Sequence, residues 1–237
     1  INAVSVGVYH TCSSDEVEWI VGNSDSKIVF LGNNPNDNDE NEKMPNHRLF
    51  KILEKLDKVK FVIAFPGVNT IDHKKVISWD TFIQMGENVK EEALENRFNE
   101  ILPNNISSLI YTSGTTGNPK GVIITHDNWD FECQQLLTVA NFEPNDKSIS
   151  WLPGAHVFGQ AVDCHFTARL AMHSYIVDSP LNTVDYAKEI QPHLFISVPR
   201  VYEKVYSNFK SAVDSKAILK IGLKIPVLSG VLKNKLK

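Results

Sequence analysis

Cysteine is scarce in this chain, and its three copies lie far apart. Cys12, Cys133 and Cys164 form no C-x-x-C pair among the 237 residues. This odd, scattered set supports neither a disulfide framework nor a zinc site, and it favours a reducing compartment. Long apolar runs are also missing, because none approaches the roughly 18–20 residues that a membrane-spanning helix needs. Disulfide-rich secreted proteins and helical membrane proteins are therefore not indicated.

Basic residues are too few over most of the chain to suggest a nucleic-acid partner. The net charge is −4, but residues 201–237 carry +6 and the first 200 residues carry −10. An acidic surface repels phosphate backbones, so we expect no nucleic-acid binding. The hydrophobic and charged contents, 42% and 22%, are ordinary for a globular protein.

Short apolar, β-branched runs alternate with helical patterns along the chain. The runs predict strands over residues 4–9, 27–31, 60–65, 107–112, 121–125, 147–152, 174–178 and 194–198. The periodic stretches predict helices over residues 15–21, 46–56, 79–85, 91–98, 127–140, 157–170, 182–190 and 201–213. Ser13 or Ser14 is the predicted cap of the first helix, and residues 32–44, rich in Asn and Asp, are predicted to form a loop.

This alternation predicts an α/β fold with parallel-rich sheets flanked by helices. The predicted strands are apolar throughout rather than alternating, which is typical of sheets covered on both faces.

Residues 112–122 (TSGTTGNPKGV) combine small, hydroxylated and basic residues directly after an apolar strand. Glycines let a backbone approach an anion closely, hydroxyls donate hydrogen bonds to phosphate oxygens, and Lys120 adds a positive charge. The pattern is neither G-x-x-x-x-G-K-[ST] nor G-x-G-x-x-G. A polyphosphate loop and a solvated Gly/Ser/Thr turn both remain open on composition alone.

The order of these residues, however, resembles a known family. Residues 111–122, followed by Thr125 and His126, are similar to the phosphate loop of the adenylate-forming enzymes. Residues 150–160 (SWLPGAHVFGQ) resemble a segment of the long-chain and bubblegum-type fatty acyl-CoA synthetases. Residues 197–204 (SVPRVYEK) and 7–11 (GVYHT) resemble two further segments of these enzymes. The resemblance implies that residues 1–237 are part of an AMP-binding N-terminal domain, without the C-terminal domain.

The resemblance also implies a two-step reaction. A fatty carboxylate attacks the α-phosphate of ATP to give an acyl-adenylate, and the thiol of coenzyme A then displaces AMP, with Mg²⁺ sharing the phosphate charge. The implied phosphate-binding residues are Thr112, Ser113, Gly114, Thr115, Thr116, Gly117 and Lys120. The implied acyl-substrate residues are His156, Phe158 and Gly159, while His156 as a capping or core histidine stays an alternative. We assign no catalytic and no metal-binding residue, and we expect His126 to cap the helix that follows it.

Several parts of the family pattern are missing from these residues. The chain has no Thr-Glu and no Gly-Asp dipeptide, so the family's adenine segment and ribose-binding Asp have no counterpart. We therefore expect residues 1–237 alone to lack appreciable ligase activity. Two alternatives stay open: another adenylate-forming ligase, activating aryl or amino acids, or a non-catalytic nucleotide- or lipid-binding remnant.

The lysine-rich residues 215–237 allow two interpretations. Lysines alternating with Ile, Leu and Val are compatible with peripheral contact to an anionic membrane. Gly222, Pro226 and Gly230 interrupt a long helix and favour packing against another part of the domain. We expect a location on the cytoplasmic side, with contact to an intracellular membrane as the open question, and we assign no oligomeric state.

Overall fold

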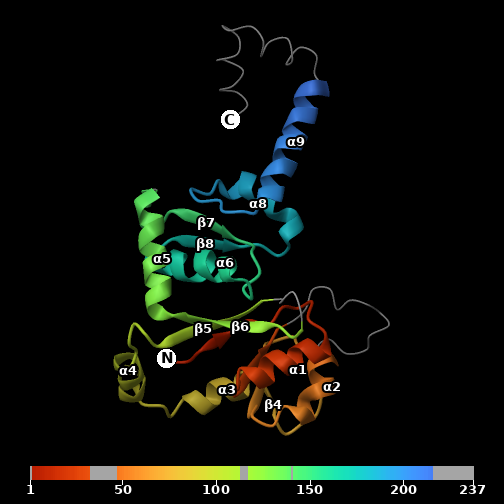
Figure 1. The fold of residues 1–237 in the computed structure, drawn as a ribbon, viewed down its shortest axis with the longest axis vertical. Helices are drawn as coiled ribbons and strands as arrows, with labels where there is room; N and C mark the ends of the chain where they lie inside the picture. The colour runs from red at the N-terminus through yellow and green to blue at the C-terminus, as the bar shows by residue number, and fades with distance from the viewer. Residues whose placement is uncertain (1, 33–46, 113–116, 140, 216–237) are drawn as a thin grey trace. The chain divides into compact units, whose positions relative to one another are not determined.

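The computed structural model describes residues 2–32, 47–112, 117–139 and 141–215, and they form a mixed α/β fold (Figure 1). The chain divides into two compact units. Unit 1 comprises Ile1–Glu143 and Pro153–Leu170, and unit 2 comprises Pro144–Leu152 and Ala171–Lys237. The α/β prediction is confirmed. Residues 33–44 of the loop predicted over 32–44, and residues 216–237 of the lysine-rich segment 215–237, lie outside the described residues.

A three-stranded parallel sheet carries the main core of unit 1. Strand β3 (Phe61–Ala64) pairs with β2 (Ile28–Leu31) on one side and with β4 (Val76–Ser78) on the other. Val62 and Ile63 are fully buried. The core cluster also takes residues from α1 (Ser14–Asn23), α2 (His47–Ile52) and the 3-10 turn η1 (Leu53–Lys55). Strand β4 was not predicted, since three residues give too short a pattern.

Helix α1 begins with a complete capping box. The Ser13 hydroxyl accepts a hydrogen bond from the Glu16 N–H at 3.3 Å, and the Ser13 N–H donates to Glu16 Oε2 at 2.7 Å. Two N–H groups that the helix leaves without intrahelical partners are thereby satisfied. The prediction of a cap at Ser13 or Ser14 is confirmed at Ser13.

The second sheet of unit 1 contains a hairpin. Strand β5 (Ile106–Thr112) pairs in parallel with β1 (Ser5–Val6) and antiparallel with β6 (Lys120–Thr125). A strand was predicted over residues 4–9, and only the two residues of β1 form it. Helices α3 (Trp79–Gly86) and α4 (Glu91–Asn99) lie between β4 and β5 in the sequence and confirm the predicted helices.

Helix α5 (His126–Val139) is capped by Thr125 rather than by His126. The Asn128 N–H donates to Thr125 Oγ1, and the Thr125 N–H donates to Asn128 Oδ1. The prediction for His126 was wrong because the preceding threonine already supplies the oxygen that the helix needs. Trp129, on this helix, donates from Nε1 to the Ser108 hydroxyl at 3.4 Å and stacks on His165.

The predicted helix over residues 157–170 has an unusual middle. It runs as α6 (Val157–Gly159), a π-helical stretch η2 (Gln160–Phe166) and α7 (Thr167–Arg169). The Thr167 hydroxyl donates to the Val162 carbonyl, five residues earlier, at 2.7 Å. Such π-helical stretches are frequent at functional sites.

Unit 2 is built on the parallel pair β7 (Lys147–Ser150) and β8 (His173–Ile176). After β8 come the 3-10 turn η3 (Pro180–Asn182), α8 (Thr183–Ile190) and α9 (Pro199–Ser215). The strand predicted over residues 194–198 was wrong, since only Leu194 bridges to Ser148. The next carbonyls instead accept side-chain bonds, Phe195 from the Tyr202 hydroxyl and Ile196 from Trp151 Nε1.

Strands β6 and β8 are examples that depart from the expectation that both sheet faces are covered. Ile123 on β6 is 59% exposed, and Ile176 on β8 is 85% exposed. No helix within the described ranges is long and apolar enough to cross a bilayer.

Candidate functional site

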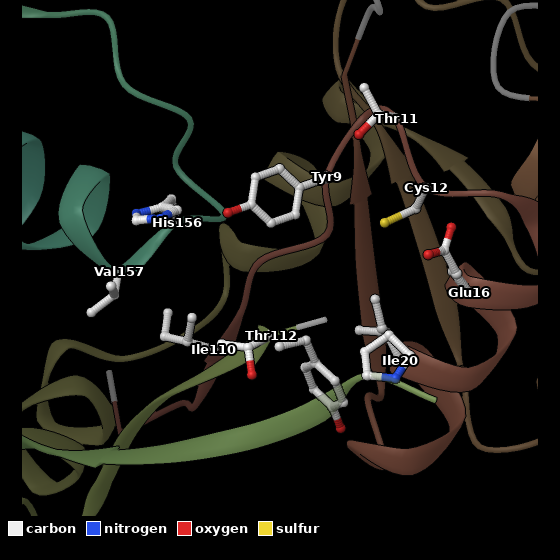
Figure 2. Close-up of a pocket in the computed structure, with 11 residues that line it drawn as sticks. Tyr9, Thr11, Cys12, Glu16, Ile20, Ile110, Thr112, His156 and Val157 are labelled. Atoms are coloured by element: carbon white, nitrogen blue, oxygen red, sulfur yellow. The ribbon is translucent and has the colours of Figure 1, made fainter. Parts of the chain in front are cut away.

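A cavity of about 420 Å³ lies in unit 1 beside the predicted phosphate loop (Figure 2). Its walls come from the segment after β1, from α1, from the end of β5, from the stem before β6 and from the start of α6. The lining residues are Tyr9, Thr11, Cys12, Glu16, Ile20, Ile110, Tyr111, Thr112, Pro119, His156 and Val157. Two motifs that are far apart in the sequence, around Thr112 and around His156, thus meet at one cavity.

The turn that contains Tyr9 and Cys12 is fixed by backbone and side-chain bonds. The Cys12 N–H donates to the Tyr9 carbonyl at 3.0 Å, and Arg48 Nη1 donates to the carbonyls of His10 and Cys12 at 2.7 and 3.2 Å. Burial raises the pKa of the Tyr9 hydroxyl and of the Cys12 thiol, and Glu16 raises the latter further. Both groups are therefore neutral at pH 7.

Glu16 contributes a carboxylate to the same wall. Hydrogen bonds from the Ser13 N–H and, secondly, the Ser13 hydroxyl lower the pKa of this carboxyl group. The side chain that completes the capping box therefore also places a negative charge at the cavity (Figure 2).

The described ends of the phosphate loop face each other across the hairpin. Thr112 ends β5 and Lys120 begins β6, and the two are register partners. Both are exposed, and the part of the chain that the structure describes holds no ion pair to Lys120. Hydroxyl, lysine and backbone N–H donors at one edge suit a polyphosphate. Ser113, Gly114, Thr115 and Thr116 lie outside the described residues.

Gly117 and Gly121 of the loop motif are glycines for different structural reasons. Gly117 has φ +89°, in the left-handed region that favours glycine, and an added Cβ would meet nothing within 4 Å. A Cβ on Gly121 would lie 3.0 Å from Tyr111 Cζ. Gly121 therefore makes room for the Tyr111 ring.

His156 caps α6 and also lines the cavity. Its Nδ1 accepts a hydrogen bond from the Phe158 N–H at 3.1 Å, so the neutral ring carries its proton on Nε2. Figure 2 shows the hydroxyl end of Tyr9 directed toward this ring. Capping and a substrate role are compatible in this geometry. Phe158 and Gly159 are not among the lining residues, and their acyl-substrate role stays a prediction.

The segment that presents His156 is held by two contacts. Ala155 packs so closely on Gly7 that a Cβ at Gly7 would lie 2.5 Å from Ala155 Cα. The buried Gln160 donates from Nε2 to the Gly154 carbonyl at 3.0 Å. The sequence prediction did not assign Gly7, Tyr9 or Glu16 to the site, although the GVYHT resemblance marked the first two.

The described residues contain no group of three or more His, Cys, Asp or Glu side chains suited to a metal ion. A second cavity, of about 320 Å³, lies at the carboxyl ends of β3 and β4, and it shares no lining residue with the first cavity.

Residues 1–232 match the family model described as AMP-binding enzyme. The chain belongs to this family, which confirms the resemblance drawn from residues 111–122.

Individual curated proteins are similar to the chain over most of its length. The long-chain-fatty-acid–CoA ligase ACSBG2 of Gallus gallus is 28% identical over 224 residues, which are 92% of this chain and 28% of that protein. Long chain acyl-CoA synthetase 4 of Arabidopsis thaliana is 30% identical over 229 residues, 91% of this chain and 32% of that protein. The chain thus spans about a third of the length of these curated relatives.

Solved structures agree at the level of the fold. The anthranilate CoA ligase AuaEII, solved in complex with anthranoyl-AMP, has a TM-score of 0.64 and 18% identity, and the match covers 81% of this chain and 35% of that one. At this identity the likeness defines the fold alone. It confirms the predicted fold of an adenylate-forming enzyme.

Proposed function

We propose that this chain is the ATP-binding part of a long-chain fatty acid–CoA ligase that works through an acyl-adenylate. In the first step a carboxylate oxygen bonds to the α-phosphorus of ATP and pyrophosphate leaves. In the second step the thiolate of coenzyme A bonds to the acyl carbon and AMP leaves. The names of the curated relatives support the fatty-acid substrate.

One observation carries this proposal: Thr112, from the loop motif, and His156, from the acyl-ligase motif, line the same 420 Å³ cavity. A chance match to either motif would not bring both to one cavity. Lys120, opposite Thr112 in the hairpin, supplies positive charge for the phosphates. The neutral Tyr9 hydroxyl and the Nε2–H of His156 supply hydrogen-bond donors at the other wall.

Mg²⁺ belongs to this proposal as a counter-charge on the ATP phosphates. When bound it would neutralise charge that develops on the leaving pyrophosphate. Among the residues that the structure describes, Thr112 would offer Mg²⁺ a hydroxyl at the cavity, and no group of three or more His, Cys, Asp or Glu side chains is suited to hold the ion.

The test is a substrate panel on the longest natural form of the protein that contains these residues. ATP–pyrophosphate exchange is measured with long-chain fatty acids, with benzoate and anthranilate, and with amino acids. We expect exchange with the fatty acids, and thioester formation once coenzyme A is added. Exchange with only the aryl or amino acids would replace the fatty-acid assignment by the other adenylate-forming class.

A matched pair of variants tests the site itself. Lys120→Met should weaken ATP binding by tenfold or more, because a charge-assisted contact to phosphate is lost (about 1.5–3 kcal/mol). Lys188→Met, which removes a lysine whose ion pair among the described residues is with the exposed Asp185, is the control. Equal ATP affinity in both variants would contradict the assignment of the loop.

A further inference from the structure

Helix α1 is bonded to the second stem of the phosphate loop. Trp19 donates from Nε1 to the carbonyl oxygen of Pro119 at 2.8 Å, across a hundred positions of sequence. Pro119 directly precedes Lys120, so this hydrogen bond fixes the peptide group that joins Pro119 to Lys120. Trp19 is 38% exposed, so it is not part of a buried core.

The same helix is bonded to the first stem. The Tyr111 hydroxyl donates to Asn23 Oδ1 at 2.6 Å, and Tyr111 directly precedes Thr112. Tyr111 is buried, and the missing side chain of Gly121 leaves room for its ring. Both residues next to the phosphate contacts are thus tied to α1.

Trp19 and Asn23 stand four positions apart on α1, so they lie on one face of the helix. Glu16 and Ile20, also four apart, line the cavity from the same helix. Helix α1, which is capped at its start, therefore contacts both stems of the loop and forms part of the cavity wall.

We propose that Trp19 and Asn23 are positioning residues that fix the two stems of the phosphate loop, and so hold Thr112 and Lys120 in the geometry that binds a polyphosphate. This inference rests on the proposed function. Neither residue contacts the phosphates, because each acts through the residue before a phosphate contact. Pre-ordering the stems lowers the conformational cost that the loop would otherwise meet on binding.

The experiment titrates the longest natural form of the protein that contains these residues with inorganic tripolyphosphate and with AMP, by calorimetry, and compares Trp19→Phe with the unmodified protein. Phe keeps an aromatic ring and removes the indole donor. We expect about three- to tenfold weaker binding of tripolyphosphate, as the loss of one hydrogen bond predicts. AMP, which lacks the β- and γ-phosphates, should bind the two proteins equally, and the melting temperature should change little.

A second variant acts at the other stem. Tyr111→Phe removes the hydroxyl that binds Asn23 and keeps the ring that packs over Gly121. It should weaken tripolyphosphate binding to a similar extent. Trp79→Phe is the matched control, because Trp79 packs against Phe65 and Phe82 near the other sheet and should leave binding unchanged.

The NMR signal of the Trp19 indole N–H reports directly on its hydrogen bond to Pro119. The chain has four tryptophans, and the Trp19 indole N–H is identified in a ¹⁵N spectrum by its absence in Trp19→Phe. Tripolyphosphate should shift this signal and leave that of Trp79 in place.

The outcomes separate the two proposals. If the unmodified protein binds neither ATP nor tripolyphosphate, both the loop assignment and this inference fail. If the unmodified protein binds tripolyphosphate and both variants bind it equally well, only this inference fails. Equal weakening of AMP and tripolyphosphate with a large drop in melting temperature would also overturn it, since a general structural role then explains the loss.

Discussion

At the scale of single residues, the region around the site depends on two glycines whose lack of a side chain leaves room for neighbouring residues. Gly7 lets Ala155 pack closely against it, and Gly121 leaves room for the Tyr111 ring. Neither position needs a left-handed backbone, so the reason for each glycine is space. Such a requirement comes from a distant contact, and no local pattern in the sequence reveals it.

Gly7→Ala should therefore destabilise the protein by about 1–3 kcal/mol, because the new Cβ would lie 2.5 Å from the backbone of Ala155 and force it away. Urea unfolding measures the loss. Gly22→Ala is the control: it lies in α1 with nothing within 4 Å of the new Cβ, and it should stabilise the helix by about 0.5–1 kcal/mol. Equal effects of the two substitutions would contradict the close contact.

His165 links stability to pH. Its ring stacks on Trp129 with centroids 4.3 Å apart, and burial, followed by repulsion from His126, lowers its pKa from 6.5. The unfolded chain therefore takes up this proton at a higher pH than the folded chain. The contribution is fully present above about pH 6.5 and is lost as the pH falls toward the folded pKa.

We expect the free energy of unfolding to decrease between pH 7.5 and pH 5.5, and to decrease less in His165→Phe, which keeps an aromatic ring on Trp129. Denaturant titrations at the two pH values measure this. His10→Gln, at an exposed position, should retain the wild-type dependence. An unchanged pH dependence in His165→Phe would rule out His165 as its source.

At the scale of elements, helix starts and buried strands could be predicted from the sequence, because their causes are local. A helix cap at Ser13 or Ser14 was predicted, and the structure has it at Ser13, where Glu16 completes a capping box. The run at residues 60–65 predicts a buried strand, and β3 is the most buried strand. The exchange of strand bonds for side-chain bonds after Leu194 has no such local signal.

The site was predictable to the same limited degree. The loop and His156 were predicted from motifs of consecutive residues; the structure places Thr112 and His156 at one cavity, and their binding roles stay predictions. Trp19 and Asn23 could not be predicted, because a tryptophan and an asparagine on a helix carry no mark of the distant backbone or hydroxyl that they bind. The π-helical stretch around Gln160 likewise depends on packing rather than on composition.

Ser13→Ala should destabilise the protein by about 1 kcal/mol near pH 7, because the hydroxyl that caps α1 is lost. The Ser13 hydroxyl also helps to lower the pKa of Glu16, so the variant should lose less stability than the wild type as the pH falls below about 4.5. Urea unfolding at pH 7 and pH 4 measures both effects.

Ser14→Ala is the natural control for this prediction, because Ser14 is the first residue of the helix and not its cap. It should change the stability by less than about 0.5 kcal/mol. A larger loss at Ser14 than at Ser13 would place the cap one residue later.

At the scale of the whole molecule, burial differs strongly between strands. Val62 and Ile63 on β3 are fully buried within unit 1, whereas all four residues of β8 in unit 2 are exposed. Amide hydrogen exchange should therefore be slowest in β3 and much faster in β8, since exposed strands open locally at low cost. Mass spectrometry of the exchanged peptides measures this, and equal protection of the two strands would contradict it.

Segments of the two units alternate along the sequence, and this order affects folding during synthesis. Residues 144–152, which include β7, are made before unit 1 receives its last segment, Pro153–Leu170. Strand β7 must then wait for β8, more than twenty positions later, before it can pair. A nascent chain thus carries an unpaired strand while unit 1 is still closing, so translation speed through residues 144–176 should influence the yield of folded protein.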